Sequence, residues 1–277
     1  MKKTLIALAV VALGGAAVAQ QAAPAPVRVT LTRLDCGRSA QPRDLAAFSD
    51  TYAMDGFKKA LVASCYLIRH GDEYLLWDTG YAVTARDNPQ AGLLMPQTVV
   101  EQLRRLNVDP ARVGRVGISH YHGDHTGQAR DFARATLLIG AGDWAALTAT
   151  ERAPGVDPSP LAAWVSGGGK VEPVRGDKDV WGDGSVVILD TPGHTPGHHS
   201  LLVRLKGKGN VLLTGDLSHF AENYAVDGVP RFNTNRADTL ASLHRFKRMA
   251  AALKATVVIQ HEPADITKLP AFPQAAE

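Results

Sequence analysis

The 277-residue sequence predicts an α+β fold in a single domain, in which two β-sheets pack face to face and helices cover their outer sides. Strand-like segments occur in two groups along the chain, and segments with helical spacing follow each group. No linker-like stretch divides residues 27–277, and a hydrophobic content of 45% supplies enough apolar side chains for one large core.

The first strands are indicated by apolar alternation and by a hairpin pattern. Apolar residues alternate at 27–34, and a hairpin follows with arms at 60–70 and 73–80. An irregular stretch at 36–58 lies between them. Loops of this length in compact domains are usually functional, so we expect this stretch near a substrate site.

Helices and further strands follow the hairpin. Helical spacing at 97–106, with Pro96 placed to start the helix, predicts the first helix, and the clearest helical pattern spans 237–253. Further strand-like segments lie at 112–119, 136–140, 185–190, 198–205, 210–216 and 256–260.

The N-terminus has the pattern of a secretory signal peptide. Two lysines precede an apolar run, and small residues at 17–19 form a cleavage site. The run, about 15 residues long, is shorter than the roughly 20 that span a bilayer. We therefore expect a signal peptide at 1–19, a tether at 20–26 and a folded domain at 27–277. The protein would be periplasmic or secreted, without stable membrane insertion.

The charge balance gives no sign of a nucleic-acid partner. Cleavage after residue 19 would remove two lysines and leave 28 basic against 27 acidic side chains. The sequence contains no basic run with interleaved aromatic residues. The oligomeric state stays open.

Cys36 and Cys65 are the two cysteines of the chain. A disulfide between them would persist in an exported protein, and both lie at or near predicted strands. Two buried thiols, which pack as small apolar groups, are an equal alternative on the sequence alone.

The segment SHYHGDHTG places three histidines and an aspartate within six positions at the end of a predicted strand. In an extended backbone, side chains at i and i+2 point to the same side, which would bring His120 and His122 together. A sharp turn at Gly123 would let Asp124 and His125 face the same point. This arrangement predicts two neighbouring metal positions, which need further ligands.

Those ligands are present downstream, again at the ends of predicted strands. His194 lies in the turn TPGHTPGH, Asp216 ends the segment LLTGD, and His261 begins HEP after the last predicted strand. Together with WDTG upstream, these segments resemble the metallo-β-lactamase superfamily in order and approximate spacing. The resemblance covers nearly all of the chain after the predicted signal peptide. It implies a four-layer αβ/βα sandwich and a metal-dependent hydrolase.

The resemblance also implies the role of each ligand. His120, His122 and His194 match a first metal site, and Asp124, His125 and His261 match a second. Asp216 matches a bridging carboxylate, where an anion offsets the repulsion between two dications about 3.5 to 4 Å apart. Asp78 in WDTG is expected to orient a ligand from behind.

Two zinc ions are the expected cofactor, although histidine and carboxylate ligands also suit iron, manganese and cobalt. A hydroxide held between the metals would attack an electrophilic carbonyl, because zinc lowers the pKa of water from about 16 to roughly 7. Asp124 would pass the proton onward. The implied reaction is hydrolysis without a covalent enzyme intermediate.

Within the superfamily, the motifs look most like the N-acyl homoserine lactonase group, which opens lactone rings. A small-molecule lactone or ester is therefore the expected substrate, and quorum quenching the expected role. The loops at 35–60 and 82–96 are expected to form an apolar acyl pocket that includes Phe57, Leu93, Leu94 and Met95.

Two further residues are candidates for contact with the substrate. Lactonases of this group commonly carry a tyrosine just after the bridging aspartate, whereas this chain has His219, with Tyr224 five residues further on. Either side chain is a candidate to donate a hydrogen bond to the substrate carbonyl. Of the remaining histidines, two are expected to be structural, His198 and His199, and two to be solvated, His70 and His244.

Three alternatives stay open: an exported metallo-β-lactamase, an organophosphate hydrolase and a non-catalytic exported zinc-binding protein. The signal peptide favours the first, whereas Asp216 disfavours it, because β-lactamases of this fold generally use a non-bridging arrangement there. The bridge and the long loops disfavour the zinc-binding protein, since a metal buffer needs no open coordination position.

Overall fold

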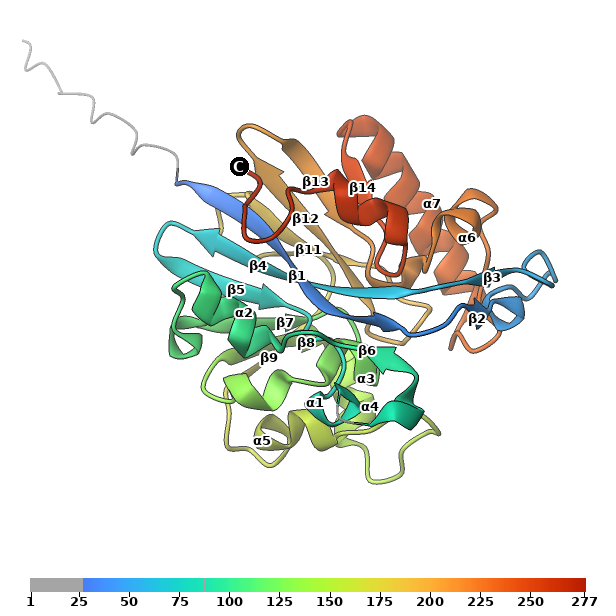
Figure 1. Cartoon of the computed structure of the whole chain (residues 1–277), viewed down its shortest axis with the longest axis horizontal. Helices are drawn as coiled ribbons and strands as arrows, with labels where there is room; N and C mark the ends of the chain where they lie inside the picture. The colour runs from blue at the N-terminus through green and yellow to red at the C-terminus, as the bar shows by residue number, and fades with distance from the viewer. Residues whose placement is uncertain (1–26, 87) are drawn as a thin grey trace, which may run out of the picture.

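The computed structural model describes residues 27–86 and 88–277, and the predicted signal peptide and tether lie outside these ranges. The described chain forms a seven-stranded, a five-stranded and a two-stranded sheet. The two large sheets face each other with helices on their outer sides, so the predicted single-domain α+β sandwich is confirmed (Figure 1). Every helix in the described ranges is too short or too polar to span a bilayer.

The seven-stranded sheet has the order β6-β1-β4-β5-β7-β8-β9. Antiparallel pairing joins β6, β1, β4 and β5, and parallel pairing joins β5, β7, β8 and β9. The predicted hairpin is β4–β5. The strands of this sheet are β1 (Val29–Ser39), β4 (Val62–His70), β5 (Glu73–Trp77), β6 (Leu93–Leu94), β7 (Arg115–Ile118), β8 (Thr136–Gly140) and β9 (Val171–Val174).

The five-stranded sheet has the order β10-β11-β12-β13-β14 and is antiparallel except for the pair β13–β14. A parallel pair needs a long crossover, which here includes the helix α7 (Arg236–Ala252). The strands of this sheet are β10 (Lys178–Asp179), β11 (Val186–Asp190), β12 (His199–Leu205), β13 (Gly209–Leu213) and β14 (Thr256–Val258).

Side-chain caps set where the principal helices begin. The Asn235 side chain accepts a hydrogen bond from the Asp238 backbone N–H and caps α7, the predicted long helix. The first predicted helix begins at Val99 and not beside Pro96, because Thr98 and Glu101 form a capping box. The other α-helices are α1 (Val83–Arg86), α2 (Val99–Arg105), α3 (Gly123–Thr126), α4 (Ala141–Thr148), α5 (Ala162–Val165) and α6 (Ala221–Ala225).

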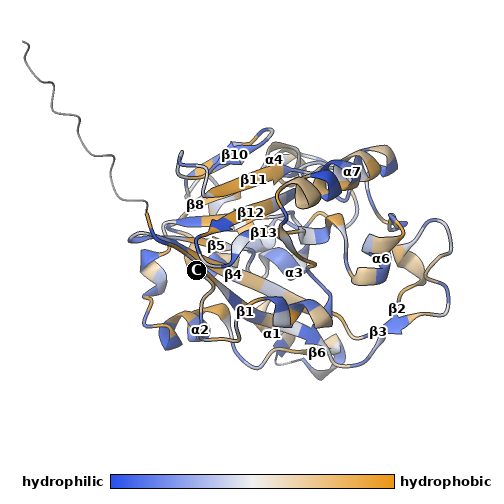
Figure 2. Cartoon of the chain, turned by 90° about the horizontal axis from the view of Figure 1, so that it is seen from above, coloured by the Kyte–Doolittle hydropathy of each residue, from blue (hydrophilic) through white to orange (hydrophobic). Residues whose placement is uncertain are grey.

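Three buried clusters define the four layers. Between the sheets, Ile68 and Trp77 from the first sheet pack with Val203 and Leu213 from the second. A second cluster lies between the first sheet and its helices α2 and α4, and a third between the second sheet and α7. Figure 2 shows apolar residues concentrated on strands such as β11 and β12. Each fully buried large side chain contributes about 1.5–3 kcal/mol, so these clusters fix the sandwich.

The stretch at 36–58 is more regular than predicted. β1 continues through Ser39, and a short hairpin of β2 (Arg43–Asp44) and β3 (Lys58–Lys59) follows. We call residues 40–60 the β2–β3 lobe; it lies beside α6 (Figure 1). Leu45 anchors the lobe by packing in a buried cluster with Phe220.

The two cysteines form a disulfide between neighbouring strands. Cys36 on β1 and Cys65 on β4 have Cα atoms 5.8 Å apart, which is within the usual range for bridged pairs. Both side chains are buried. Of the two alternatives that the sequence left open, the structure therefore shows the disulfide.

Candidate metal centre

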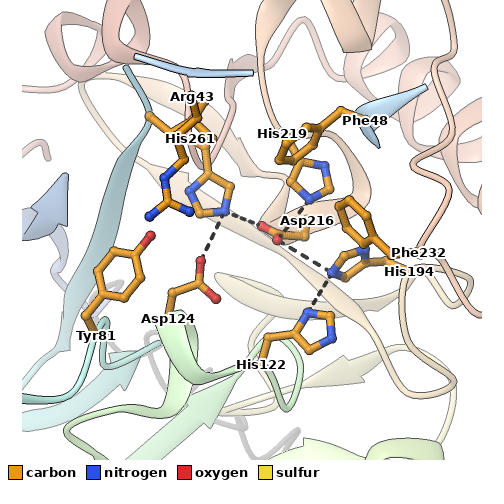
Figure 3. Close-up of a pocket in the computed structure, with 11 residues that line it drawn as sticks. Arg43, Phe48, Tyr81, His122, Asp124, His194, Asp216, His219, Phe232 and His261 are labelled. Atoms are coloured by element: carbon orange, nitrogen blue, oxygen red, sulfur yellow. Dashed lines mark hydrogen bonds and ion pairs between the residues drawn. The ribbon is translucent and has the colours of Figure 1, made fainter. Parts of the chain in front are cut away.

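The predicted metal ligands lie just beyond the ends of strands, at one edge of the sandwich. The segment SHYHGDH follows β7, and the segments that carry His194, Asp216 and His261 follow β11, β13 and β14. The structure brings these side chains together, and Figure 3 shows the ligands that line the pocket pointing toward its centre.

His120, His122 and His194 form the first group of donors. His120 Nε2 lies 2.9 Å from His122 Nδ1, and His194 Nε2 lies 3.1 Å and 3.0 Å from these two atoms. Three ring nitrogens this close together present their lone pairs to one point, as a transition-metal site requires. His120 and His122 point to the same side, as their i, i+2 spacing predicts.

Asp124, His125 and His261 form the second group, beside Asp216. Asp216 Oδ1 lies 3.3 Å from His125 Nε2 and 3.0 Å from His261 Nε2, and Asp124 Oδ2 lies 3.7 Å from His261 Nε2. His125 Nε2 and Asp216 Oδ1 are buried without a hydrogen-bond partner among the described residues. Such orphaned polar atoms are rare in proteins, and a cation would satisfy both, so these residues fit a metal ion.

Asp216 connects the two groups through its two carboxylate oxygens. Oδ1 faces the second group, whereas Oδ2 lies 3.5 Å from His194 Nε2 and 3.7 Å from His120 Nε2. The Asp216 backbone N–H donates a hydrogen bond of 2.9 Å to His198 Nε2, which fixes the loop. A carboxylate in this position would suit two cations, with one oxygen for each.

Asp78 holds His125 from behind, as its place in WDTG predicts. Its buried carboxylate accepts hydrogen bonds from His125 Nδ1 at 2.9 Å and from the backbone N–H and hydroxyl of Ser119 at 2.7 and 2.9 Å. Because Nδ1 carries a hydrogen in this contact, Nε2 of His125 faces the centre and is the atom that would bind a cation.

Two other ligands are held in the same way by partners that the sequence did not indicate. His261 Nδ1 donates to the Val62 carbonyl at 2.6 Å, and His194 Nδ1 donates to the Asn233 side-chain oxygen at 2.8 Å. Val62 acts through its backbone, and Asn233 lies in an irregular segment, so neither has a sequence signal. Both contacts leave Nε2 of the histidine free to bind a cation.

Burial and nearby charges shift the pKa values of the histidine ligands in opposite directions in the two groups. Burial holds the pKa of His120 and His194 well below the ordinary value, which keeps both rings neutral at neutral pH. Burial acts in the same direction on His125, but the surrounding carboxylates, Asp216 first, outweigh it and raise the His125 pKa well above the ordinary value. Burial opposes ionisation of Asp216, yet the nearby imidazoles hold its pKa well below the ordinary value. The second group thus already attracts positive charge, which a metal ion would supply.

A close contact between two loops places His194 beside the SHYH segment. Asp143 accepts hydrogen bonds from the backbone N–H groups of Tyr121 and Gly197 at 3.0 and 2.7 Å, and from the Thr195 hydroxyl at 2.9 Å. At Gly140, an added Cβ would lie 1.8 Å from the Gly197 carbonyl oxygen. Asp143 was not predicted as a functional residue, because nothing in its local pattern distinguishes it from a surface acid of α4.

The turn inside the motif differs from the one predicted. Gly123 begins the helix α3, and its Cβ position faces open space, without a left-handed φ angle. The start of a helix, and not the conformational freedom of glycine, therefore redirects the chain. The prediction for Gly123 was wrong, although Asp124 and His125 do face the same region.

Three of the four remaining histidines lie as predicted. His198 and His199 are buried and contact backbone groups, and His244 is exposed on α7. His70 is not solvated, because its ring stacks on Trp181 with centroids 4.5 Å apart. The sequence does not indicate this contact, because the stacking partner is distant along the chain.

The walls of the pocket come in part from the predicted loop at 35–60, which supplies Arg43 and Phe48, but not from the individual residues predicted within it. Phe48, Leu61 and Phe232 supply apolar surface, and Arg43 and Tyr81 supply polar groups (Figure 3). None of these five side chains was predicted individually, because they come from segments that are distant from one another in the sequence.

The predicted acyl pocket was wrong in its residues. Phe57 and Leu94 are exposed, and Met95 is buried. Leu93 and Leu94 form the edge strand β6, which pairs with the end of β1. None of these four residues lines the pocket of the metal centre.

His219 and Tyr224, the two candidates for substrate contact, are separated by the fold. His219 lines the pocket, with Nε2 3.1 Å from Asp216 Oδ2. Tyr224 on α6 packs against the cluster under α7, with the Lys247 ammonium 4.6 Å from its ring centre. Tyr224 does not line the pocket, so the structure does not place it for the predicted contact with the substrate.

Comparison with known proteins agrees with this geometry. The profile of the Metallo-beta-lactamase superfamily matches residues 59–261, a range that includes every predicted metal ligand. The chain belongs to the metallo-β-lactamase superfamily. This membership confirms the resemblance inferred from the motifs.

Several relatives of the chain are lactonases. N-acyl homoserine lactonase AttM of Rhizobium radiobacter is 30% identical over 236 residues, covering 75% of this chain and 85% of that protein. The N-acyl homoserine lactonase of Bacillus cereus is 29% identical over 210 residues, covering 72% and 80%. A solved N-acyl homoserine lactone hydrolase with N-hexanoyl-L-homoserine bound at its catalytic metal center is 25% identical, with a TM-score of 0.76, and the match covers 90% of this chain and 99% of that one. The prediction of a lactonase-like hydrolase is confirmed.

Proposed function

We propose that this chain hydrolyses the lactone ring of N-acyl homoserine lactones or close analogues, and so quenches quorum-sensing signals. The observation that carries the proposal is the pair of donor groups joined by Asp216 at the floor of a pocket with aromatic walls. The lactonase relatives support this substrate class over β-lactams. The lactonase relatives also disfavour the non-catalytic zinc-binding alternative.

Seven side chains would hold two divalent cations. His120, His122 and His194 suit one cation, and Asp124, His125 and His261 suit the other, with Asp216 shared. Zinc is the proposed metal, and iron, manganese and cobalt suit the same ligands. When bound, the cations supply Lewis acidity that polarises a carbonyl and lowers the pKa of water.

Asp124 is placed to accept the proton that hydrolysis releases. Its side chain is 24% exposed and lines the pocket, whereas the Asp216 side chain is only 5% exposed (Figure 3). A carboxylate that reaches both the pocket and solvent accepts a proton and then returns it to water. Asp124 therefore suits this task better than Asp216.

His219 is placed to donate a hydrogen bond to a substrate oxygen. Its Nδ1 is buried without a partner among the described residues. A buried unpartnered N–H costs about 1–3 kcal/mol, whereas an unused lone pair is tolerated more readily. The favoured tautomer therefore carries its hydrogen on Nε2, which faces Asp216 and the pocket. Phe48 holds the ring edge-on at 4.9 Å.

Phe48 and Phe232 are placed to contact the acyl chain. Their ring centroids lie 5.3 Å apart, and both line the pocket. Phe232 is 46% exposed, so the apolar wall continues from the pocket toward solvent. Phe48 belongs to the predicted 35–60 loop, whereas Phe232 lies outside both loops expected from the sequence.

The direct test is a substrate panel on protein whose metal content has been measured. We expect two metal ions per chain and hydrolysis of N-hexanoyl-L-homoserine lactone that is lost on chelation and restored by zinc. A cephalosporin and a phosphotriester in the same panel test the β-lactamase and organophosphate alternatives. Faster turnover of either compound than of every lactone, at equal metal content, would replace the proposal.

His219→Phe is expected to lower kcat about a hundredfold with unchanged metal content, because removal of one oxyanion donor costs about 10²–10³. Steady-state kinetics and elemental analysis measure the two quantities. Tyr224→Phe is the matched control and should stay within about twofold of wild type, since Tyr224 lies outside the pocket. A wild-type kcat for His219→Phe would exclude the donor role.

We further infer that residues 1–19 direct export and that the enzyme acts in the periplasm or outside the cell. The Cys36–Cys65 disulfide supports this location, because such bonds persist in oxidising compartments. N-terminal sequencing of the protein from a periplasmic fraction tests this inference. Protein that is found in the cytoplasm with residues 1–19 still attached would contradict it.

A further inference from the structure

We propose that Arg43 and the Tyr81 hydroxyl form a carboxylate-binding subsite in the wall of the pocket. Figure 3 shows both side chains on the Asp124 side, whereas His219 and Phe232 lie on the other side of Asp216. The inference rests on the proposed lactone hydrolysis and deepens it, since it assigns an acidic group to the substrate or the product.

The guanidinium of Arg43 is free to bind a ligand. It has neither an ion-pair nor a hydrogen-bond partner in the part of the chain that the structure describes, although it lines the pocket. The carboxylates that share the pocket, Asp124 and Asp216, face imidazoles instead. A free guanidinium presents a planar fork of N–H donors, which matches the two oxygens of a carboxylate.

The backbone that carries Arg43 is fixed relative to the metal centre. Arg43 pairs with Lys59 across the β2–β3 lobe, and the Lys59 ammonium lies 2.7 Å from the Glu262 carboxylate, directly after His261. Leu45, two residues after Arg43, is buried in the cluster with Phe220. The lobe therefore holds Arg43 at a constant place on the pocket wall.

Tyr81 is fixed by contacts of its backbone carbonyl and of its ring. Its carbonyl accepts a hydrogen bond of 3.0 Å from Gln128 Nε2, and its ring fits over Gly37, where an added Cβ would lie 2.9 Å from the ring. Burial raises the pKa of Tyr81, so the phenol stays protonated and acts as a donor. The subsite thus offers guanidinium and phenol donors, and the only acceptor on these two side chains is the phenol oxygen. This excess of donors favours a ligand with anionic oxygens.

A carboxylate can come from two sources. Ring opening breaks the acyl C–O bond of the lactone, adds water, and leaves a hydroxyl group and a new carboxylate on one product. Alternatively, the substrate itself carries a carboxylate that hydrolysis leaves unchanged. Both sources present the same chemistry to Arg43, and two arms of one experiment distinguish them.

The first arm measures product binding by calorimetry. N-hexanoyl-L-homoserine is compared with its neutral carboxamide on metal-loaded wild type and variants of equal metal content. Wild type is expected to bind the acid more tightly than the amide, and Arg43→Gln should lower this acid-to-amide ratio about tenfold. Arg43→Lys, which keeps the charge but not the fork, and Tyr81→Phe should each lower the ratio about threefold. Arg134→Gln removes the same charge from a separate groove beside α2 and should keep the ratio.

The second arm measures the KM ratio for a γ-lactone that bears a ring carboxylate and for its methyl ester. If Arg43→Gln changes only the acid-to-amide ratio of the first arm, the subsite binds the product carboxylate. If it changes the KM ratio of the second arm, the subsite binds a carboxylate of the substrate. Ratios within about twofold of wild type in both arms overturn the proposal. If no lactone is hydrolysed but the acid-to-amide ratio still depends on Arg43, the proposed function fails while the subsite stands.

Discussion

Replacement of Asp216 by Asn is expected to lower kcat/KM for a lactone by at least about a thousandfold, or about 4 kcal/mol, and to leave fewer than two metal ions per chain. Asn keeps the shape of the side chain, but its amide nitrogen would present N–H to one of the two donor groups. It also removes the negative charge that offsets two dications. Kinetics and elemental analysis of the same preparation measure both effects.

The control for this variant is Asp227→Asn. Asp227 forms an ion pair with Lys247 at the protein surface and does not line the pocket, so its loss should change kcat/KM by less than about twofold. An Asp216→Asn protein that retains two ions and wild-type turnover would show that Asp216 does not bridge the site.

The ligands of the centre could be predicted because local geometry determines them. The SHYHGDH segment follows directly from β7, so the spacing of its histidines sets their direction before any tertiary contact forms. His194, Asp216 and His261 each lie a few residues beyond a strand, and strands of one sandwich end at a common edge. The alternation of apolar residues predicted the strands for the same local reason.

The walls of the pocket could not be predicted residue by residue, because contacts between distant segments create them. Phe48 in the β2–β3 lobe meets Phe232, far along the chain, and neither has a local pattern that sets it apart from a surface phenylalanine. Conversely, Tyr224 is close to Asp216 in sequence, but α6 turns its ring toward α7. Sequence proximity to Asp216 therefore predicted the place of His219 in the pocket but not the place of Tyr224.

Asp78→Asn is expected to damage the second donor group at least as much as Asp78→Ala, although Asn is closer in shape. The Ser119 backbone N–H requires an oxygen at the Oδ1 position, so the amide NH₂ would occupy the Oδ2 position beside His125 Nδ1. Nδ1 would then have to accept a hydrogen bond, and the imidazole hydrogen would move to Nε2. A hydrogen on Nε2 points at the metal position and removes the lone pair that coordinates the cation.

The expected result for Asp78→Asn is a loss of about 10³ in kcat/KM together with about one metal ion per chain, since a wrong histidine tautomer costs about 10⁴ in a catalytic triad. Asp78→Ala places no amide N–H beside His125 Nδ1, so the imidazole hydrogen is not driven to Nε2. This variant should weaken metal affinity only about 10- to 100-fold. Competition with a chromophoric chelator measures the affinities. In thermal unfolding of the metal-free proteins, Asp78→Asn should be more stable than Asp78→Ala. Asn retains the hydrogen bond from the Ser119 N–H, whereas Ala leaves this buried N–H without a partner. Tighter metal binding by the Asn variant than by the Ala variant would mean that Asp78 acts through charge or packing alone, and not by selecting the tautomer of His125.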